Sequence, residues 1–302
     1  MTLMVALIGE QTLPNLLPIR HYQPESVLLV YTSRTEAMSQ RLQALLLKDT
    51  KVHMLETDAY DIKDISSKLT KKLEELGAAS LLFNLTGGTK SMVLAAYQVA
   101  QNYVAPVFYF QSEGKTNKIY YYVWKHGRLV AQLDEKSKNG FPEYLTLNDF
   151  FDVQLGRNTW HEAGPSYNGS KKDGGFFEKA IADALRSHKY EVMCGVKAFN
   201  DQVDVDVAVR YENQVGVIEA KIGDQARRLD GVRQLNTSKR HLGTYTRLFY
   251  VINTTHSESQ KLIIEASNIK VISLFEYVAN AVSLTANDTN KLIKEIEGVM
   301  KG

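Results

Sequence analysis

Short apolar runs alternate with amphipathic stretches along the first third of the chain. The runs are rich in β-branched and aliphatic residues, which predicts buried strands, and the stretches between them have helical periodicity. The predicted strands are 4–8, 27–31, 52–56, 80–85 and 106–110, and the predicted helices are 34–47, 62–76 and 90–103. Because strands and helices that alternate in this way build a mostly parallel sheet, a doubly wound α/β fold is expected here.

The periodicity weakens beyond this region. Two further runs, 118–124 and 128–133, flank His126 and Gly127 and predict a hairpin appended to the sheet. Glycine- and lysine-rich clusters then interrupt the chain, and one short helix is predicted among them at 148–154.

These patterns divide the chain into a first domain at 1–140, a junction at 141–170 and a second domain at 171–302. A chain of 302 residues is long enough for two cores. The second domain has predicted strands at 191–198, 203–211, 214–222, 248–252 and 270–273, and predicted helices at 176–187, 225–241, 258–266 and 287–300. It is therefore expected to be a second α/β domain.

The composition is that of a globular protein, with 44% hydrophobic and 23% charged residues. No apolar run approaches the roughly 20 residues that a membrane-spanning helix needs, so no membrane partner is expected. Cys194 is the single cysteine, which excludes a disulfide within the chain and fits a reducing cytoplasm. The net charge is only +2, so any binding to nucleic acid would depend on local basic patches.

One such patch lies on the predicted helix at 225–241. Its basic residues are Arg227, Arg228, Arg233, Lys239 and Arg240. They could contact phosphates, which position a nucleic acid without reading its sequence. They could equally form a solvated helix face, and the sequence leaves both interpretations open.

Carboxylates and a lysine recur on two adjacent predicted strands. Strict alternation at 203–209 places Asp204 and Asp206 on one face, and Glu219 and Lys221 share a face of the next strand. If a two-residue turn joins these strands, Asp206 lies opposite Glu219 and Asp204 lies opposite Lys221. Opposed Cβ atoms are roughly 4.5–5.5 Å apart, close enough for two carboxylates to bind one divalent ion.

This combination of residues suits phosphodiester hydrolysis. A divalent cation relieves the repulsion between the carboxylates, and it can activate water and polarise a phosphate. The expected metal ligands are Asp206 and Glu219, with Asp204 as a possible additional one. Lys221 could hold the attacking water or stabilise negative charge in the transition state. The alternative is a solvated strand face, on which acidic residues are common.

Glu178, Asp206 and the run Glu219-Ala220-Lys221 resemble the PD-(D/E)xK superfamily of restriction-endonuclease-like nucleases. The resemblance implies a metal-dependent nuclease that uses Mg²⁺ or Mn²⁺ to cut DNA or RNA. It implies catalytic roles for Glu178, Asp206, Glu219 and Lys221. Asp204 stands where this family frequently has glutamate, a change that keeps a carboxylate.

A glycine turn follows the predicted strand at 80–85, in the sequence Thr86-Gly87-Gly88-Thr89-Lys90. Glycines let a backbone approach a ligand, and a helix N-terminus favours anions. Neither a Walker A motif nor Gly-x-Gly-x-x-Gly is present, so ATP hydrolysis and dinucleotide binding are not indicated. On these residues alone, a ligand loop and a tight turn without a ligand both stay open.

The run Asn84–Lys90 resembles the ligand loop of CARF domains, the Rossmann-like sensors of type III CRISPR systems, and Leu7–Asn15 resembles the loop after their first strand. The resemblance implies a homodimer that binds a cyclic oligoadenylate, with cyclic tetra-adenylate the expected ring, across its two-fold axis. Ligands of open parallel sheets bind at the carboxyl ends of the strands. The implied contacts are Gly9, Gln11, Thr12, Thr32, Ser33, Thr86, Gly87, Gly88, Thr89 and Lys90.

Together the two halves resemble CRISPR ancillary nucleases, in which a CARF sensor is fused to a PD-(D/E)xK effector. An allosteric antiviral nuclease of the prokaryotic cytoplasm is therefore expected. Two alternatives remain. One is a ligand-controlled nucleic-acid-binding regulator with an inert nuclease fold. The other is a ring nuclease that degrades the messenger in the sensor, although no general base accompanies Thr12, Thr32 and Lys90 there.

Overall fold

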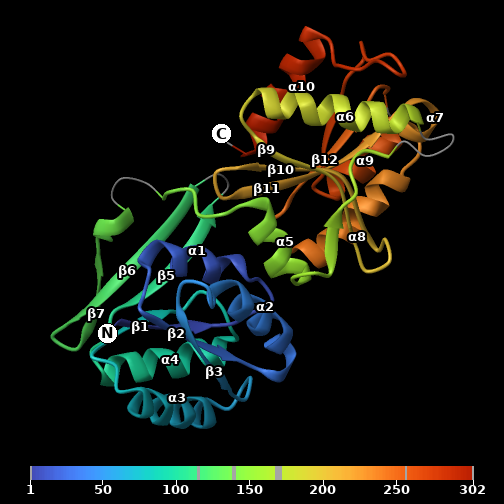
Figure 1. Cartoon of the computed structure of the whole chain (residues 1–302). Helices are drawn as coiled ribbons and strands as arrows, with labels where there is room; N and C mark the ends of the chain where they lie inside the picture. The colour runs from blue at the N-terminus through green and yellow to red at the C-terminus, as the bar shows by residue number, and fades with distance from the viewer. Residues whose placement is uncertain (1, 114–115, 138–140, 167–171, 256, 301–302) are drawn as a thin grey trace. The chain divides into compact units, whose positions relative to one another are not determined.

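The computed structural model describes residues 2–113, 116–137, 141–166, 172–255 and 257–300. The chain folds into two units, Met1–Tyr144 and Leu145–Gly302, each with its own sheet (Figure 1). The boundary at Tyr144 falls inside the segment 141–170 that the sequence assigns to the junction. The rest of that segment contributes the helix α5 (Leu147–Leu155) and the short strand β8 (Trp160–Glu162) to the second unit.

The first unit contains a seven-stranded sheet in the order β3-β2-β1-β4-β5-β6-β7. Its strands are β1 (Thr2–Leu7), β2 (Ser26–Tyr31), β3 (Lys51–Glu56), β4 (Ser80–Asn84), β5 (Val107–Glu113), β6 (Thr116–Lys125) and β7 (Arg128–Gln132). The first five run parallel, and β6 and β7 form the antiparallel hairpin predicted around His126 and Gly127. The predicted doubly wound parallel sheet is confirmed.

Helices cover both faces of this sheet (Figure 1). α3 (Ile62–Leu76) and α4 (Lys90–Asn102) lie on one face, where Ile65 and Met92 pack against Phe83 in a buried apolar cluster. On the other face lie α1 (Leu13–Tyr22) and α2 (Glu36–Leu46), the latter preceded by the short 3-10 helix η1 (Ser33–Thr35).

The helix α1 was not predicted from the sequence. Pro14 stands in its first turn and Pro18 lies inside it, and proline in a helix interior normally indicates a break. Eight of its ten residues are buried, so it also lacks the polar face that makes an amphipathic helix visible in a sequence. Burial between neighbouring elements therefore maintains a helix that local signals disfavour.

The second unit contains a six-stranded sheet in the order β13-β12-β11-β10-β9-β8. The strands not yet given are β9 (Glu191–Ala198), β10 (Val203–Tyr211), β11 (Gln214–Lys221), β12 (Arg247–Ile252) and β13 (Lys270–Ser273). β11, β12 and β13 run parallel to one another, whereas the pairs β8–β9, β9–β10 and β10–β11 are antiparallel.

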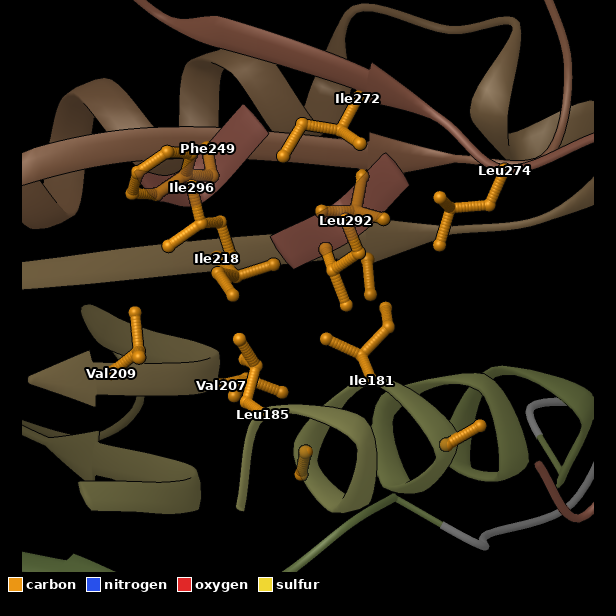
Figure 2. Close-up of a cluster of buried hydrophobic side chains, with 14 of the residues drawn as sticks. Ile181, Leu185, Val207, Val209, Ile218, Phe249, Ile272, Leu274, Leu292 and Ile296 are labelled. Carbon is orange, nitrogen blue, oxygen red and sulfur yellow. The ribbon is translucent and has the colours of Figure 1, made fainter. Parts of the chain in front are cut away.

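Two helices, α6 (Lys172–Ser187) and α10 (Ala286–Met300), cover one face of this sheet, and Figure 2 shows the core beneath them. Leu292 of α10 and Ile181 of α6 meet Ile218 of β11 there. The remaining helices are α7 (Gly223–Ala226), α8 (Asp230–Leu242) and α9 (Glu258–Ala266). The helix predicted at 225–241 is thus two helices, α7 and α8, with a turn between them. No helix in the described residues is long and apolar enough to cross a membrane.

Replacement of Leu292 by alanine tests this core. The side chain is fully buried, so Leu292→Ala should lower the free energy of unfolding of the second unit by about 2–5 kcal/mol. Leu262 on α9 is 67% exposed, and Leu262→Ala should change it by less than about 0.5 kcal/mol. Calorimetry of the full chain compares the two. Equal shifts would contradict the placement of α10 in the core.

Candidate functional site

The predicted catalytic carboxylates of the strands lie where β10 and β11 separate. The described pairing of these strands ends at Val207 opposite Ile218, which is the register predicted from the sequence. Asp206 precedes Val207, on the side away from the hairpin turn, and its carboxylate accepts a hydrogen bond from the backbone amide of Ala220 at 2.8 Å. A side-chain oxygen therefore joins the two strands at the point where the backbone ladder stops.

Lys221 connects the two carboxylates. Its Nζ lies 3.1 Å from Asp206 Oδ2 and forms a close ion pair with Glu219 Oε1. Glu219 is 1% exposed, and its burial, reinforced by the negative charge of Asp206, raises the pKa of Glu219 well above its usual range. Burial opposes the charge of Lys221, but the two carboxylates outweigh this effect and raise the pKa of the lysine. The ammonium therefore stays protonated and neutralises part of the buried negative charge.

Glu178 reaches the same site from α6. Its Oε2 accepts a hydrogen bond from the backbone amide of Ser166 at 2.9 Å. Burial, followed by the negative charge of Asp206, raises the pKa of Glu178 to about 7. The fold thus brings together the four residues to which the nuclease resemblance assigns catalytic roles, and one of them titrates close to neutral pH.

Asp204 lies beside this group with a different partner. It stands opposite Lys197 of β9, and Lys197 Nζ is 3.8 Å from its Oδ1. Burial raises the pKa of Asp204, and the charge of Lys197 partly offsets this effect. The sequence placed Lys221 opposite Asp204, whereas Lys197 is the cation found within ion-pair distance of it. A role for Asp204 as an additional metal ligand stays a prediction.

Glu178, Asp204 and Asp206 border a pocket of about 470 Å³. Several of its residues were not singled out from the sequence, among them Gly164, Gly195 and Gln234. Gly195 has a φ of +65°, and a Cβ there would lie 2.1 Å from the carbonyl oxygen of Gly164. Only glycine therefore lets that segment approach β9 so closely. Gln234 of α8 donates a hydrogen bond from Nε2 to the backbone carbonyl of Asp204 at 3.0 Å, which ties α8 to this side of the pocket.

A glycine also lets α8 pack against the floor of the site. A Cβ at Gly231 would lie 2.5 Å from the ring of Tyr250 and 3.1 Å from Cγ of Glu219. Burial raises the pKa of Tyr250 to about 12, so its hydroxyl stays protonated and donates to the carbonyl of Arg228 at 3.2 Å. Glycine in a helix lowers its stability by about 1 kcal/mol relative to alanine. A glycine within a predicted helix, such as Gly231, was therefore the sequence feature that could have indicated a close approach.

The donor set fits a divalent cation. Within the described ranges, no group of three or more histidine, cysteine, aspartate or glutamate side chains is already arranged as a metal site. Even so, Glu178, Asp206 and Glu219 are all buried and one ammonium faces them. Burial, followed by the negative charge of Asp206, raises the pKa values of Glu178 and Glu219, and a bound cation would offset both effects. Oxygen donors with excess negative charge suit Mg²⁺ or Mn²⁺.

The ligand loops predicted in the first unit meet at the carboxyl ends of β1, β2 and β4. A Cβ at Gly9, after β1, would lie 3.2 Å from the amide nitrogen of Gly88, after β4. Arg34, after β2, forms a close ion pair with Glu10. Three loops that are far apart in the sequence therefore lie side by side at one edge of the sheet, where open α/β sheets bind their ligands.

Two buried asparagines hold these loops together. Asn84 Nδ2 donates to Asn15 Oδ1 and to the carbonyl of Pro14, both at 3.0 Å. Asn15 in turn donates to the carbonyl of Leu7 at 3.0 Å, and the amide of Thr86 donates to Asn84 Oδ1 at 3.0 Å. Both asparagines lie in the runs that resemble CARF loops, Leu7–Asn15 and Asn84–Lys90, but the sequence alone indicated no role for either. Their role here is to fix the glycine turn to β1 and α1.

The threonines predicted as ligand contacts also have roles within the fold. Thr12 is 1% exposed at the start of α1, and the Thr32 hydroxyl contacts another hydroxyl within η1 at 3.3 Å. Thr86 Oγ1 accepts a hydrogen bond from the backbone amide of Phe110 in β5 at 2.8 Å. Thr89 Oγ1 caps α4 by accepting one from the backbone amide of Met92 at 3.2 Å. The predicted contacts that are exposed or partly exposed are Gly9, Gln11, Ser33, Thr86, Gly87, Gly88, Thr89 and Lys90.

The fold of the first unit agrees with the comparison to protein families. Residues 3–138 match the Card1 CARF domain. This match confirms the resemblance indicated by Asn84–Lys90 and Leu7–Asn15. No curated protein matches the chain.

The chain is also similar, along nearly its whole length, to solved structures. Can2 from Sulfobacillus thermosulfidooxidans, in complex with cyclic tetra-adenylate, superposes with a TM-score of 0.72 at 17% identity over 97% of this chain and 99% of Can2. The protein VC1899 from Vibrio cholerae gives 0.69 at 14% identity over 99% and 98% of the two chains.

A third structure, a type III CRISPR defence DNA nuclease activated by cyclic oligoadenylate, gives a TM-score of 0.66 at 15% identity. The match covers 97% of this chain and 51% of that nuclease, so this chain spans about half of its length. At these identities the likeness shows a shared fold. Both predicted halves of the fold, the Rossmann-like parallel-sheet domain and the α/β domain that follows it, are confirmed.

Conversion of Glu178 to glutamine tests the charge balance of the site without added metal. Because the pKa of Glu178 is raised to about 7, the folded state favours the protonated acid. This contribution to stability is complete below about pH 4.5 and is lost as the pH rises through about 7. At pH 8, Glu178→Gln should therefore stabilise the second unit by about 1–3 kcal/mol. Thermal unfolding at pH 5 and pH 8 measures the effect, and Glu212→Gln at the exposed hairpin turn is the control. Destabilisation at pH 8 would contradict the pKa assignment.

Gly87→Ala tests the glycine turn of the first unit. A Cβ at Gly87 would lie 2.1 Å from the backbone carbonyl oxygen of Leu7, so the loop must move away from β1. The first unit should lose about 1–3 kcal/mol of stability, measured by denaturant unfolding. Gly298→Ala is the control, because a Cβ at Gly298 meets no atom within 4 Å. An unchanged midpoint for Gly87→Ala would show that this close approach is not needed.

Proposed function

We propose that this chain is a metal-dependent nuclease that cyclic oligoadenylate activates by binding to its CARF domain. The convergence of Glu178, Asp206 and the buried Glu219 near Lys221, beside a pocket that all of these residues except Glu219 line, carries this proposal. Burying three carboxylates is costly unless the site binds cations. Because a domain that matches the CARF family lies on the same chain, binding of its ligand would regulate this site.

In this proposal Asp206 and Glu219 hold Mg²⁺ or Mn²⁺, which when bound lowers the pKa of water and polarises the scissile phosphate. Lys221 remains protonated because its pKa is raised, so it stabilises negative charge on the phosphate and does not act as a base. Glu178, with a pKa of about 7, can accept or release a proton at neutral pH. Its fixed bond to the amide of Ser166 orients the carboxylate for that transfer.

The activator is assigned from the first unit. The CARF match and the loops at the carboxyl ends of β1, β2 and β4 support a cyclic oligoadenylate, and the fold shared with the cyclic tetra-adenylate complex of Can2 makes that ring the first to test. A symmetric ring suits a cleft between two identical sensors, so the active form is proposed to be a homodimer. DNA, RNA or both are the proposed substrates.

A cleavage assay with a matched control tests the proposal. Labelled single-stranded DNA, supercoiled plasmid and RNA are incubated with Mn²⁺, with and without cyclic tetra-adenylate. Glu219→Gln should slow cleavage by at least about 100-fold, because it removes a charged ligand at a fully buried position. Glu212→Gln, at the exposed turn of the same hairpin, should cut at the wild-type rate.

The outcomes separate the two halves of the proposal. Cleavage that requires the ring and disappears in Glu219→Gln supports both. Cleavage that ignores the ring leaves the nuclease and removes its regulation by this ligand. Tight binding of the ring without any cleavage would favour an inert nucleic-acid-binding regulator, and linearised ring would favour a ring nuclease.

A further inference from the structure

We propose that the turn joining α7 to α8 is a phosphate clamp, in which Arg227 and Arg228 hold the nucleic-acid backbone beside the catalytic pocket. This inference rests on the proposed nuclease function and adds the residues that position its substrate. Neither residue belongs to the catalytic group described above.

The need for a clamp follows from the charge of the pocket. Its lining contains five acidic residues and two lysines; the acidic residues are Asp173, Glu178, Asp204, Asp206 and Asp224. The two lysines, Lys197 and Lys221, are already engaged with Asp204, Asp206 and Glu219. A polyanionic backbone is repelled by such a surface, so cations outside the pocket must hold it in place.

The α7–α8 turn is next to the pocket along the chain. Gly223, Asp224 and Gln225 of α7 line the pocket, and the two arginines follow after one buried residue. Both arginine side chains are exposed. Among the residues that the structure describes, neither guanidinium has an acidic partner, so both are available for phosphates.

The backbone of this turn is held from several sides. Gln260 Nε2 of α9 donates to the carbonyl of Arg227 at 2.6 Å, and the hydroxyl of Tyr250 donates to the carbonyl of Arg228 at 3.2 Å. The amide of Gly223 donates to Asn253 Oδ1 at 2.9 Å. A fixed backbone lowers the entropic cost of placing two long side chains against a ligand. Tyr250 also packs against Gly231 beside Glu219, which links the turn to the floor of the catalytic site.

The other basic residues of this region are less suited to the role. Arg233 lies 3.6 Å from Asp230 and is therefore partly neutralised. Lys239 and Arg240 lie in the last turn of α8, roughly 14–15 Å along the helix from its first residue, Asp230, at 1.5 Å per residue. The structure thus distinguishes two arginines from a basic stretch that the sequence presents as uniform.

Binding measurements at varied salt concentration test the clamp. In this experiment, binding of a labelled DNA oligonucleotide, single-stranded or duplex, to the full chain carrying Glu219→Gln is measured in the presence of cyclic tetra-adenylate. Adding Arg227→Gln and Arg228→Gln should weaken binding about 10–100-fold at low salt and reduce the slope of log K against log salt by about 1–2. Arg240→Gln, the matched control on α8, should leave both values nearly unchanged.

Kinetics in the otherwise unchanged protein distinguish positioning from a structural role. The arginine-to-glutamine pair should raise KM by a similar factor and change kcat little, because it removes binding outside the reacting centre. The pair Arg227→Lys and Arg228→Lys keeps the charge and should restore most of the salt slope.

Three results would overturn the clamp: an unchanged KM and salt slope in a protein that cuts normally, an equal loss in Arg240→Gln, or a fall in kcat alone. These differ from failure of the nuclease proposal, in which the wild-type chain cuts nothing. A wild-type chain that neither binds nor cuts nucleic acid would overturn both.

Discussion

Three buried carboxylates share one ammonium in the second unit, and this imbalance of charge constrains the structure around it. Asp206 and Glu219 both contact Lys221, and burial raises the pKa of Glu178 to about 7, so this carboxyl is partly protonated at neutral pH. Buried charge of one sign is unfavourable unless cations compensate it. The fold accepts this cost at one point of the sheet, where β10 and β11 separate and a side-chain carboxylate accepts a strand amide. Such a cost is expected where function requires it.

Packing around that point depends on close backbone approaches. Gly231 lets α8 rest on Tyr250 and Glu219, and Gly195 lets the segment before α6 rest on β9. The Tyr250 hydroxyl also donates a hydrogen bond to the carbonyl of Arg228, so one buried phenol supports both the floor of the candidate site and the proposed phosphate clamp. In the first unit, hydrogen bonds of the buried Asn15 and Asn84 similarly hold the loops at the sheet edge in place. Each unit therefore fixes its candidate site with a few buried polar groups.

Local pattern alone was sufficient for most of the elements and for the central hairpin. Strands with period-two alternation and helices with an apolar stripe bury one face whatever their distant neighbours are, so their positions follow from nearby residues. The register of β10 against β11 followed in the same way, because a two-residue turn leaves one alignment that keeps the valines buried. The candidate residues Asp206, Glu219 and Lys221 were therefore visible in the sequence, and so was the glycine turn after β4.

Tertiary structure decided what depends on segments far apart in the chain. α1 forms despite Pro14 and Pro18 because neighbouring elements bury it, and the partner of Asp204 is Lys197 because β9 lies on its other side. Hydroxyls that looked free in a loop motif, such as those of Thr86 and Thr89, are bonded within the fold. Arg228 and Arg240 carry equal charges, but Arg228 lies three residues after the pocket-lining Gln225, whereas Arg240 lies in the last turn of α8. A sequence specifies which groups are present, but their distances from other segments, and hence their electrostatics and partners, exist only once the chain has folded.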